Sequence, residues 1–264
     1  MELADARSRL VATRFEALRW VAETGSTNTD LMDAAARGAA DGTVLVADHQ
    51  SAGRGRRGRS FEVPPQAGLL ISVLLRPRLP VERVHLLTMA VALSGSDAVQ
   101  RASTVAPGLK WPNDLVVTTP DGDRKLAGIL ADSSILNSRV EVVVAGMGLN
   151  VNWGGRWPAG LAGSAIAVDE LAGNSVDRME LLVDYLLALE PRLSQLENDG
   201  GVELLDEYRQ RSATIGRRVR VELPRSDLVG TAVDVDDSGS LIVESDGRRT
   251  VVTVGDVVHL RSDL

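Results

Sequence analysis

The segment that most restricts the fold is a run of glycine and arginine with two prolines close behind it. Residues 53–60 read Gly-Arg-Gly-Arg-Arg-Gly-Arg-Ser, which contains the spacing of a dinucleotide-binding loop and nearly that of a P-loop. Both loops need a strand before them and a helix directly after them. A Val/Leu-rich strand is expected over 43–48, but Pro64 and Pro65 are incompatible with a helix at that point. The sequence therefore argues against a doubly wound nucleotide-binding fold.

The chain changes character after Gly216. Five short Val-rich stretches follow, separated by turns such as 236–239 and 245–247. Five strands at this spacing are typical of a small β-barrel. Before Gly216, strands and helices are mixed without a regular βαβ order. We therefore expect an α+β core over residues 1–214 and a C-terminal β-barrel over residues 215–264.

Several helices of the first part have recognisable ends. Thr27, with Asp30 three residues on, predicts the start of a helix that Gly38 closes. A capping sequence at Asp177 predicts a long amphipathic helix, which we expect Pro191 to interrupt. Further helices are expected over 81–102 and 202–211, and strands over 68–75, 115–117, 127–131 and 140–145.

The bulk composition excludes several classes of function. The net charge is −7, which argues against a protein broadly adapted to nucleic acid or anionic membrane. There is no cysteine, so disulfides, thiolate zinc sites and cysteine nucleophiles are excluded, and His49, His85 and His259 are too dispersed for a local metal motif. We expect no tightly bound transition metal. The sequence has neither a signal-peptide core nor an apolar run near ~18 residues, which predicts a cytoplasmic protein without a membrane partner.

Positive charge is distributed unusually. The chain has 29 basic residues, of which only Lys110 and Lys125 are lysines. Lysine is a compact point charge, whereas arginine is a wide planar fork, so a retained lysine suggests a crowded site where one ammonium meets a phosphate or carboxylate. In the loop 53–60, glycines let the backbone approach a ligand and four arginines supply phosphate donors. Because these like charges repel, we expect the loop to be mobile until an anion neutralises it.

Five motifs in order resemble the biotin protein ligases, and together they cover nearly the whole chain. They are Gly25-Ser26-Thr27-Asn28, the stretch 50–59 from Gln50 to Arg59, Lys110-Trp111-Pro112-Asn113-Asp114-Leu115, Lys125-Leu126-Ala127-Gly128-Ile129-Leu130, and Gly146-Met147-Gly148-Leu149-Asn150-Val151. The resemblance implies an α+β fold with a mixed-sheet catalytic core related to class II aminoacyl-tRNA synthetases, followed by an SH3-like domain. This agrees with the architecture expected from the residues alone.

The resemblance also implies a reaction in two steps. Biotin and ATP, with Mg²⁺, would form biotinyl-5′-adenylate, and a lysine on a biotin carboxyl carrier domain of an acyl-CoA carboxylase would then accept biotin and release AMP. Bringing a carboxylate to a triphosphate requires positive charge, which Lys125, Arg54, Arg56 and Mg²⁺ would supply. Lys125 and Arg56 are therefore the expected catalytic residues.

The remaining site residues are carried over from the matching motifs. The resemblance implies a biotin site made by Ser26, Thr27, Asn28, Gln50, Arg54, Gly55, Arg56, Lys125 and Gly128. It implies an ATP and adenylate site made by Arg54, Arg56, Trp111, Asn113, Lys125 and Asn150. Asp114 is the candidate contact for Mg²⁺ or the ribose. The segment 152–158 matches the family poorly, and either Trp153 or Trp157, or neither, packs on adenine.

Several alternatives stay open at this point. Ser26 and Thr27 are also explained as helix caps, Trp111-Pro112 as a packed turn, and 146–148 as a strand bulge. The chain also fits a lipoate-type acyl-adenylating ligase or a non-catalytic biotin- or adenylate-binding module. About 25 residues precede the first motif, so we expect the form without a DNA-binding domain and no DNA partner. Both a monomer and a homodimer fit the family.

Overall fold

The computed structural model describes residues 1–137, 139–223 and 227–260. The helices are α1 (Leu3–Arg9), α2 (Thr27–Ala36), α3 (Leu86–Ser103), α4 (Val168–Ala172), α5 (Arg178–Asp199) and α6 (Val202–Gln210), with 3₁₀ turns at Arg14–Glu16, Arg56–Gly58 and Val81–Arg83. The strands of the first part are β1 (Leu18–Thr24), β2 (Val44–Gln50), β3 (Gly68–Leu75), β4 (Gly108–Lys110), β5 (Asp114–Thr119), β6 (Gly122–Leu136) and β7 (Arg139–Asn150).

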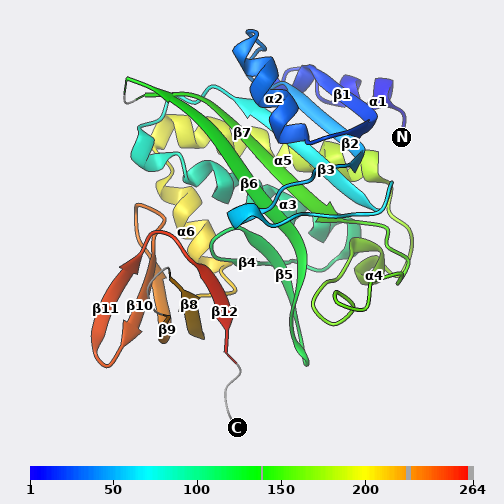
Figure 1. The fold of residues 1–264 in the computed structure, drawn as a ribbon. Coiled ribbons are helices and arrows are strands. Elements are labelled where there is room, and N and C mark those ends of the chain that lie inside the picture. Colours follow the sequence, from blue (N-terminus) through cyan, green and yellow to red (C-terminus); the bar gives the residue numbers. More distant parts are fainter. Residues whose placement is uncertain (138, 224–226, 261–264) are drawn as a thin grey trace.

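These seven strands form one mixed sheet in the order β1-β2-β3-β7-β6-β5-β4 (Figure 1). Only β1 and β2 are paired in parallel, through the crossover helix α2, and the other neighbours are antiparallel. β3 is buried along its whole length because its run of apolar residues is covered on both faces. The expected α+β class is confirmed, and the described strands do not form a doubly wound sheet.

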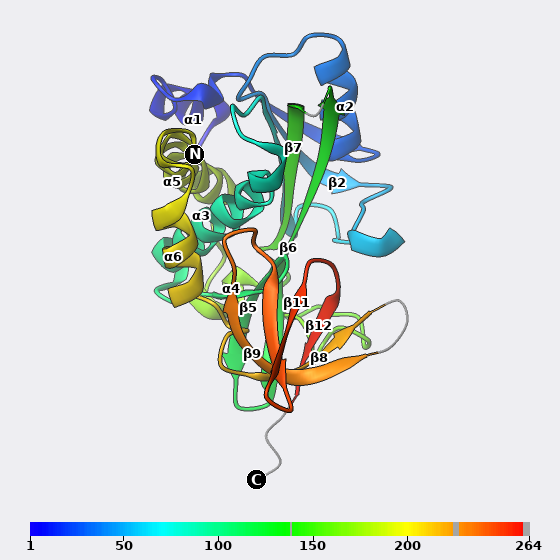
Figure 2. The ribbon, with the colours of Figure 1, turned by 90° about the vertical axis from the view of Figure 1, so that its left-hand side faces the viewer.

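Helices cover the sheet unequally. α3 and α5 pack against each other on one face, while α2 contacts β3 and β7 from the other face (Figure 2). α3 is buried over most of its length, and its apolar residues join those of α5 in the main core. The face that carries α2 is only partly covered, so side chains of β3, β6 and β7 beyond α2 are available to a cleft.

The C-terminal part forms a second, antiparallel sheet of the SH3-like kind expected. Its strands are β8 (Arg218–Glu222), β9 (Leu228–Val235), β10 (Leu241–Ser245), β11 (Arg248–Val252) and β12 (Asp256–His259), in the order β11-β10-β9-β8-β12. Alternate residues of β8 and β10 are buried, which gives this sheet an apolar face of its own. The boundary after residue 214 stays a prediction.

Three local predictions were wrong. The N-cap of α2 is Ser26, and Thr27 lies in the first turn with its N–H bonded to the side chain of Gln50. α5 runs unbroken through Pro191, because Leu189 and Leu193 on either side are buried and this packing outweighs the lost hydrogen bond. The helix expected from residue 81 begins at Leu86, after a separate 3₁₀ turn.

Four elements were not predicted from the sequence. They are α1, β1, β4 and α4, all of them short. In the part of the chain that the structure describes, no helix is long and apolar enough to cross a membrane.

Tyr185 of α5 provides a test of the packing. Its side chain is fully buried, and its hydroxyl has no hydrogen-bond partner among the described residues. An unsatisfied buried hydroxyl costs about 1–3 kcal/mol. We therefore expect Tyr185→Phe to leave the free energy of unfolding in urea unchanged or to raise it.

The neighbouring Leu186 supplies the matched control. Leu186 is also fully buried, and Leu186→Ala is expected to lower the free energy of unfolding by about 2–5 kcal/mol because it leaves a cavity. A loss above about 1 kcal/mol for Tyr185→Phe would mean that the hydroxyl has a partner and that this description of the core is wrong.

Candidate functional site

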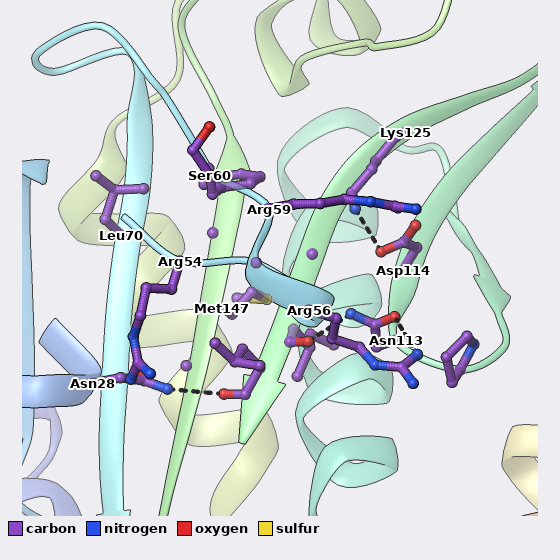
Figure 3. Close-up of a pocket in the computed structure, with 18 of the residues that line it drawn as sticks. Asn28, Arg54, Arg56, Arg59, Ser60, Leu70, Asn113, Asp114, Lys125 and Met147 are labelled. Carbon is purple, nitrogen blue, oxygen red and sulfur yellow. Dashed lines mark hydrogen bonds and ion pairs between the residues drawn. The ribbon is translucent and has the colours of Figure 1, made fainter. Parts of the chain in front are cut away.

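A cleft of about 330 Å³ lies where the large sheet, the arginine-rich loop and β12 meet. Figure 3 shows side chains of the large sheet and of the arginine-rich loop converging on it. The predicted site residues that line the cleft are Ser26, Thr27, Asn28, Gln50, Arg54, Gly55, Arg56, Trp111, Asn113, Asp114, Lys125 and Gly128. Segments more than 200 residues apart in the sequence thus form one cavity.

One end of the cleft carries uncharged hydrogen-bonding groups. Gln50 Oε1 accepts from the main-chain N–H of Thr27 at 2.8 Å and lies 2.9 Å from Thr27 Oγ1. Thr27 Oγ1 is in turn 2.7 Å from Ser72 Oγ, which donates to Asn28 Oδ1. No side-chain hydrogen bond caps α2, so the hydroxyls of Ser26 and Thr27 are not used as helix caps. Gln50, Thr27, Ser72 and Asn28 instead form a connected row of donors and acceptors, the row from Gln50 to Asn28.

Asn28 connects this row to the first arginine of the loop. Its Nδ2 donates to the carbonyl of Leu130 at 3.1 Å and to Asp132 Oδ2 at 2.9 Å. Arg54 Nη2 lies 2.7 Å from the same Asp132 oxygen. Arg54 is half-exposed, so this ion pair is weak. Arg54 is therefore held beside the polar end of the cleft without being locked there.

Lys125 projects from β6 toward Asp114 at the start of β5. Its Nζ lies 2.7 Å from Asp114 Oδ1, as Figure 3 shows. Gly128 makes room for this pair, since a Cβ at that position would lie 3.2 Å from Lys125 Nζ. The side chain of Lys125 is 41% exposed and that of Asp114 is 22% exposed. The pair is thus open to the cleft on the lysine side.

Arg56 lies beside Asn113 on the opposite wall. Arg56 Nη1 donates to Asn113 Oδ1 at 3.3 Å and to the carbonyl of Gly255 at 3.4 Å. Asn113 also donates to the carbonyl of Ile129, which fixes its amide. Burial lowers the pKa of Arg56, against the attraction of Asp256, yet the guanidinium stays charged. Of the four arginines in the loop, Arg56 has the least exposed side chain.

Asp256 of β12 faces the arginine-rich loop, and the sequence gave no indication that this residue belongs to the site. Its carboxylate lies 2.7 Å from Arg59 Nη2 and 3.4 Å from Arg57 Nη1, and an Arg56 nitrogen is 3.9 Å away. Asp256 therefore provides these arginines with an anion from within the protein, which the sequence did not predict. No signal in the sequence could pair positions about 200 residues apart.

Two glycines of β7 permit close contacts in the cleft. A Cβ at Gly146 would lie 2.2 Å from Asn28 Oδ1, and one at Gly148 would lie 2.3 Å from the ring of Phe61. Both glycines pair in regular register with β3 and β6, so the alternative of a strand bulge at 146–148 is wrong. Phe61 and Ser72 are cleft residues that the motifs did not single out.

Asn150 and the two tryptophans lie behind the cleft and do not line it. Asn150 is buried and donates to the carbonyls of Lys125 and Ile166 at 3.4 and 3.3 Å. Trp153 Nε1 donates to Asn150 Oδ1 at 3.2 Å, and Trp153 stacks on Trp157 with ring centres 4.0 Å apart. In this arrangement Asn150 supports the main chain at Lys125.

Lys110 lines the cleft beside Asp114. Burial lowers the pKa of its ammonium, against the carboxylates of Asp114 and Asp123, which raise it. This places a second lysine at the site, although the motif alone gave it no chemical role.

The described residues contain no group of three or more His, Asp or Glu side chains that could hold a metal ion. Asp114 is the only predicted metal contact, and it already faces Lys125. A single carboxylate fits Mg²⁺ only when phosphate oxygens complete its coordination.

The chain matches two protein-family profiles. Residues 20–150 match the biotin/lipoate A/B protein ligase family, and residues 214–260 match the biotin protein ligase C terminal domain.

Characterised relatives match over most of their length. The biotin–[acetyl-CoA-carboxylase] ligase of Mycobacterium tuberculosis is 43% identical over 247 residues, which cover 91% of this chain and 88% of that protein. The protein of the same name from Paracoccus denitrificans is 30% identical and is covered to 98%. The solved structure of the Aquifex aeolicus biotin protein ligase in complex with biotin and ATP has a TM-score of 0.80 and 27% identity, covering 94% of this chain and all of that one.

The contact between the loop and Asp256 predicts the behaviour of the protein without ligand. Exposed ion pairs contribute about 0.2–1 kcal/mol each. We therefore expect Asp256→Asn to speed amide hydrogen exchange over residues 50–61 by roughly two- to tenfold.

The control is Asp246→Asn, because Asp246 is exposed in the turn between β10 and β11. This change should leave exchange in the loop as in the unaltered protein. Equal exchange for Asp256→Asn and the control would show that Asp256 does not hold the loop.

Proposed function

The chain belongs to the biotin protein ligase family, and we propose that its cleft joins biotin to ATP and delivers the product to a carrier protein. The observation that carries this proposal is the layout of the cleft. Uncharged donors and acceptors lie at one end, and Lys125, Arg54 and Arg56 lie beside them. Such a cleft suits a ligand with a neutral polar head and a carboxylate that must meet a phosphate.

The neutral end fits the ureido group of biotin. That group has two N–H donors and one carbonyl acceptor, and the row from Gln50 to Asn28 offers both acceptors and donors. Ser26, Gly55 and Gly128 would border the ring system. The glycine at 146 keeps Asn28 at the wall of the cleft, since any side chain there would displace it.

In the first step a carboxylate oxygen of biotin attacks the α-phosphorus of ATP. The new bond is between that oxygen and phosphorus, and the bond to the bridging oxygen of the β-phosphate breaks, so pyrophosphate leaves. Lys125 would bridge the carboxylate and the α-phosphate and reduce their repulsion. Asp114 holds the ammonium toward the cleft before substrate arrives. Since lysine is a point charge, it fits between two oxygens where a guanidinium would not.

Mg²⁺ would enter as a companion of the triphosphate. It would neutralise charge on the phosphates, and Asp114, one of the carboxylates that line the cleft, would contact it. Trp111 and Asn113 would border the nucleotide, and Asn150 would act by supporting Lys125 from behind.

Arg56 and Arg54 would retain the adenylate. Both belong to the loop 53–60, and Arg56 reaches Asn113 on the nucleotide side. In the second step the amine of a carrier lysine attacks the carbonyl carbon of the adenylate. The bond from that carbon to the phosphate oxygen breaks, AMP leaves, and the amine loses a proton to form the amide. The acceptor would be a biotin carboxyl carrier domain.

The domain boundary is proposed after residue 214, between α6 and β8. Leu109 pairs with Ser212 immediately before this point, so the first domain keeps the connecting segment.

The test is pyrophosphate release with ATP and either biotin or lipoate. Release that depends on biotin, followed by biotin labelling of a carrier domain, supports the proposal. Release that occurs with lipoate and not with biotin would assign the lipoate-type reaction. If neither acid caused release, the chain would be a binding module without ligase activity.

Lys125→Arg is expected to reduce kcat/KM for adenylate formation at least about 100-fold, which corresponds to about 2.7 kcal/mol. The charge is kept, but the wide fork would not fit between the carboxylate of biotin and the α-phosphate. Arg139→Lys, an exposed exchange on the far part of β7, is the control and should have normal activity. Near-normal turnover of Lys125→Arg would remove the role given to Lys125.

Arg56→Gly is expected to form the adenylate but to release it about ten- to 100-fold faster, since a charged phosphate contact contributes about 1.5–3 kcal/mol. Arg57→Gly is the control, because Arg57 faces Asp256 and does not line the cleft. Release rates measured by filter binding should differ between the two variants. Equal rates would contradict the clamp.

A further inference from the structure

A line of hydrogen bonds outside the cleft joins β12 to the Trp111 segment. His259 Nδ1 lies 2.5 Å from Asp123 Oδ2, and His259 Nε2 lies 3.1 Å from Thr214 Oγ1. Thr214 Oγ1 accepts the main-chain N–H of Trp111 at 3.0 Å. The side chains of His259 and Asp123 are 8% and 7% exposed, and Thr214 is fully buried. The line therefore runs through the interior between the two sheets.

The connecting segment already holds β4 by its main chain. Leu109 N–H donates to the carbonyl of Arg211 at 3.0 Å, and Ala213 N–H donates to the carbonyl of Leu109 at 2.8 Å. The hydroxyl of Thr214 continues this pairing by one step to Trp111. A second bond, from Trp111 Nε1 to the carbonyl of Gly239 at 2.9 Å, also comes from the C-terminal sheet.

The donors and acceptors fix where each proton lies. Asp123 Oδ2 also faces Arg217 at 2.9 Å, and Asp123 Oδ1 accepts from Thr118 at 2.8 Å. Burial alone would raise the pKa of Asp123, but the bonds from His259 and Thr118 and the charge of Arg217 hold it below its usual value. The carboxylate is thus ionised and requires a proton on His259 Nδ1.

The other ring nitrogen then has a lone pair. Thr214 Oγ1 accepts from Trp111 and lies 3.1 Å from His259 Nε2, so a lone pair on Nε2 can accept the hydroxyl proton. If Nε2 carried a proton instead, two N–H groups would face one hydroxyl oxygen, and no other acceptor among the described residues lies within reach of the hydroxyl proton.

We propose that His259 is a positioning residue for the nucleotide half of the cleft. Held by Asp123 in the neutral form protonated on Nδ1, it accepts the proton of Thr214 and so directs the hydroxyl oxygen to the Trp111 N–H. Trp111 lines the cleft between Lys110 and Asn113. The C-terminal part thereby helps to position a cleft segment through the side chain of His259, in addition to the carbonyl of Gly239.

The charges around His259 favour the neutral ring. Burial lowers the pKa of His259, Lys110 and Arg217 lower it further, and Asp123 opposes them, with a net pKa below the usual value. The pKa of His259 in the folded protein lies below its value of about 6.5 in the unfolded chain, so the unfolded chain binds more protons at pH values between the two. The contribution of His259 to stability is therefore fully present above about pH 6.5 and is lost as the pH falls toward the folded-state pKa.

The direct test is NMR of protein labelled with ¹⁵N-histidine, without any ligand. We expect the ring of His259 to show a proton on Nδ1 and none on Nε2 at neutral pH. We also expect slow exchange of the Trp111 amide, which becomes at least about tenfold faster in Thr214→Val and stays slow in Thr214→Ser. A proton on Nε2 in the unaltered protein would overturn the proposal, with no variant needed.

A pair of substitutions separates the two bonds of His259. His259→Gln places an oxygen near the position of Nε2 and keeps the acceptor for Thr214. His259→Asn places an amide near Nδ1 and keeps only the donor to Asp123. This kinetic arm rests on the proposed function. We expect KM for ATP in adenylate formation to rise about tenfold in His259→Asn and to stay near normal in His259→Gln, with KM for biotin unchanged in both.

The KM values of the two variants and the ring tautomer can each support or overturn the role of His259. Equal KM for ATP in the two variants, with folding verified by circular dichroism, would reduce His259 to a structural contact. If the unaltered protein formed no adenylate at all, the proposed function would fail, while the ring tautomer and the Trp111 amide would still decide the role of His259.

Discussion

Positive charge gathered around one cleft of an acidic protein is the constraint on which the site depends. Four cations at or near the cleft have a carboxylate beside them: Arg54 faces Asp132, Lys125 faces Asp114, and Arg57 and Arg59 face Asp256. These pairs are partly exposed and therefore weak, on the order of 0.2–1 kcal/mol each. They hold the cations in place without ligand, and phosphate or carboxylate groups of a substrate can displace them at small cost.

The fold serves this arrangement by bringing distant segments to the same part of one sheet. β6 carries Lys125 and Gly128 and provides the carbonyl of Leu130, while β7 beside it contributes glycines where Asn28 and Phe61 approach. The C-terminal sheet contributes two residues of β12. Asp256 contacts the arginine-rich loop, and His259 contacts Asp123 of β6. This sheet is a wall of the site as well as a separate unit.

The sequence predicted what depends on neighbours along the chain. The five C-terminal strands, β3, the C-terminal end of α2 and the ends of α6 follow from apolar periodicity and turn residues. Pro191 was misjudged because a local rule ignores the buried leucines on either side. The ion pairs of Asp256 and the bond between His259 and Asp123 join positions more than 100 residues apart, and no local pattern carries that information. The motifs identified the cleft residues by resemblance, whereas the structure supplies the reason for Gly146 and Gly148.

Biotin and ATP are proposed to meet in one cleft and to react there to a single adenylate that the cleft retains. Native mass spectrometry of the protein mixed with biotin and MgATP tests this most directly, with an ATP analogue that cannot be cleaved between the α- and β-phosphates as the comparison. The account predicts one biotinyl-adenylate per chain with ATP, and biotin together with the intact analogue in the comparison. Biotin and uncleaved ATP bound together in the first sample, or no bound biotin in either, would contradict it.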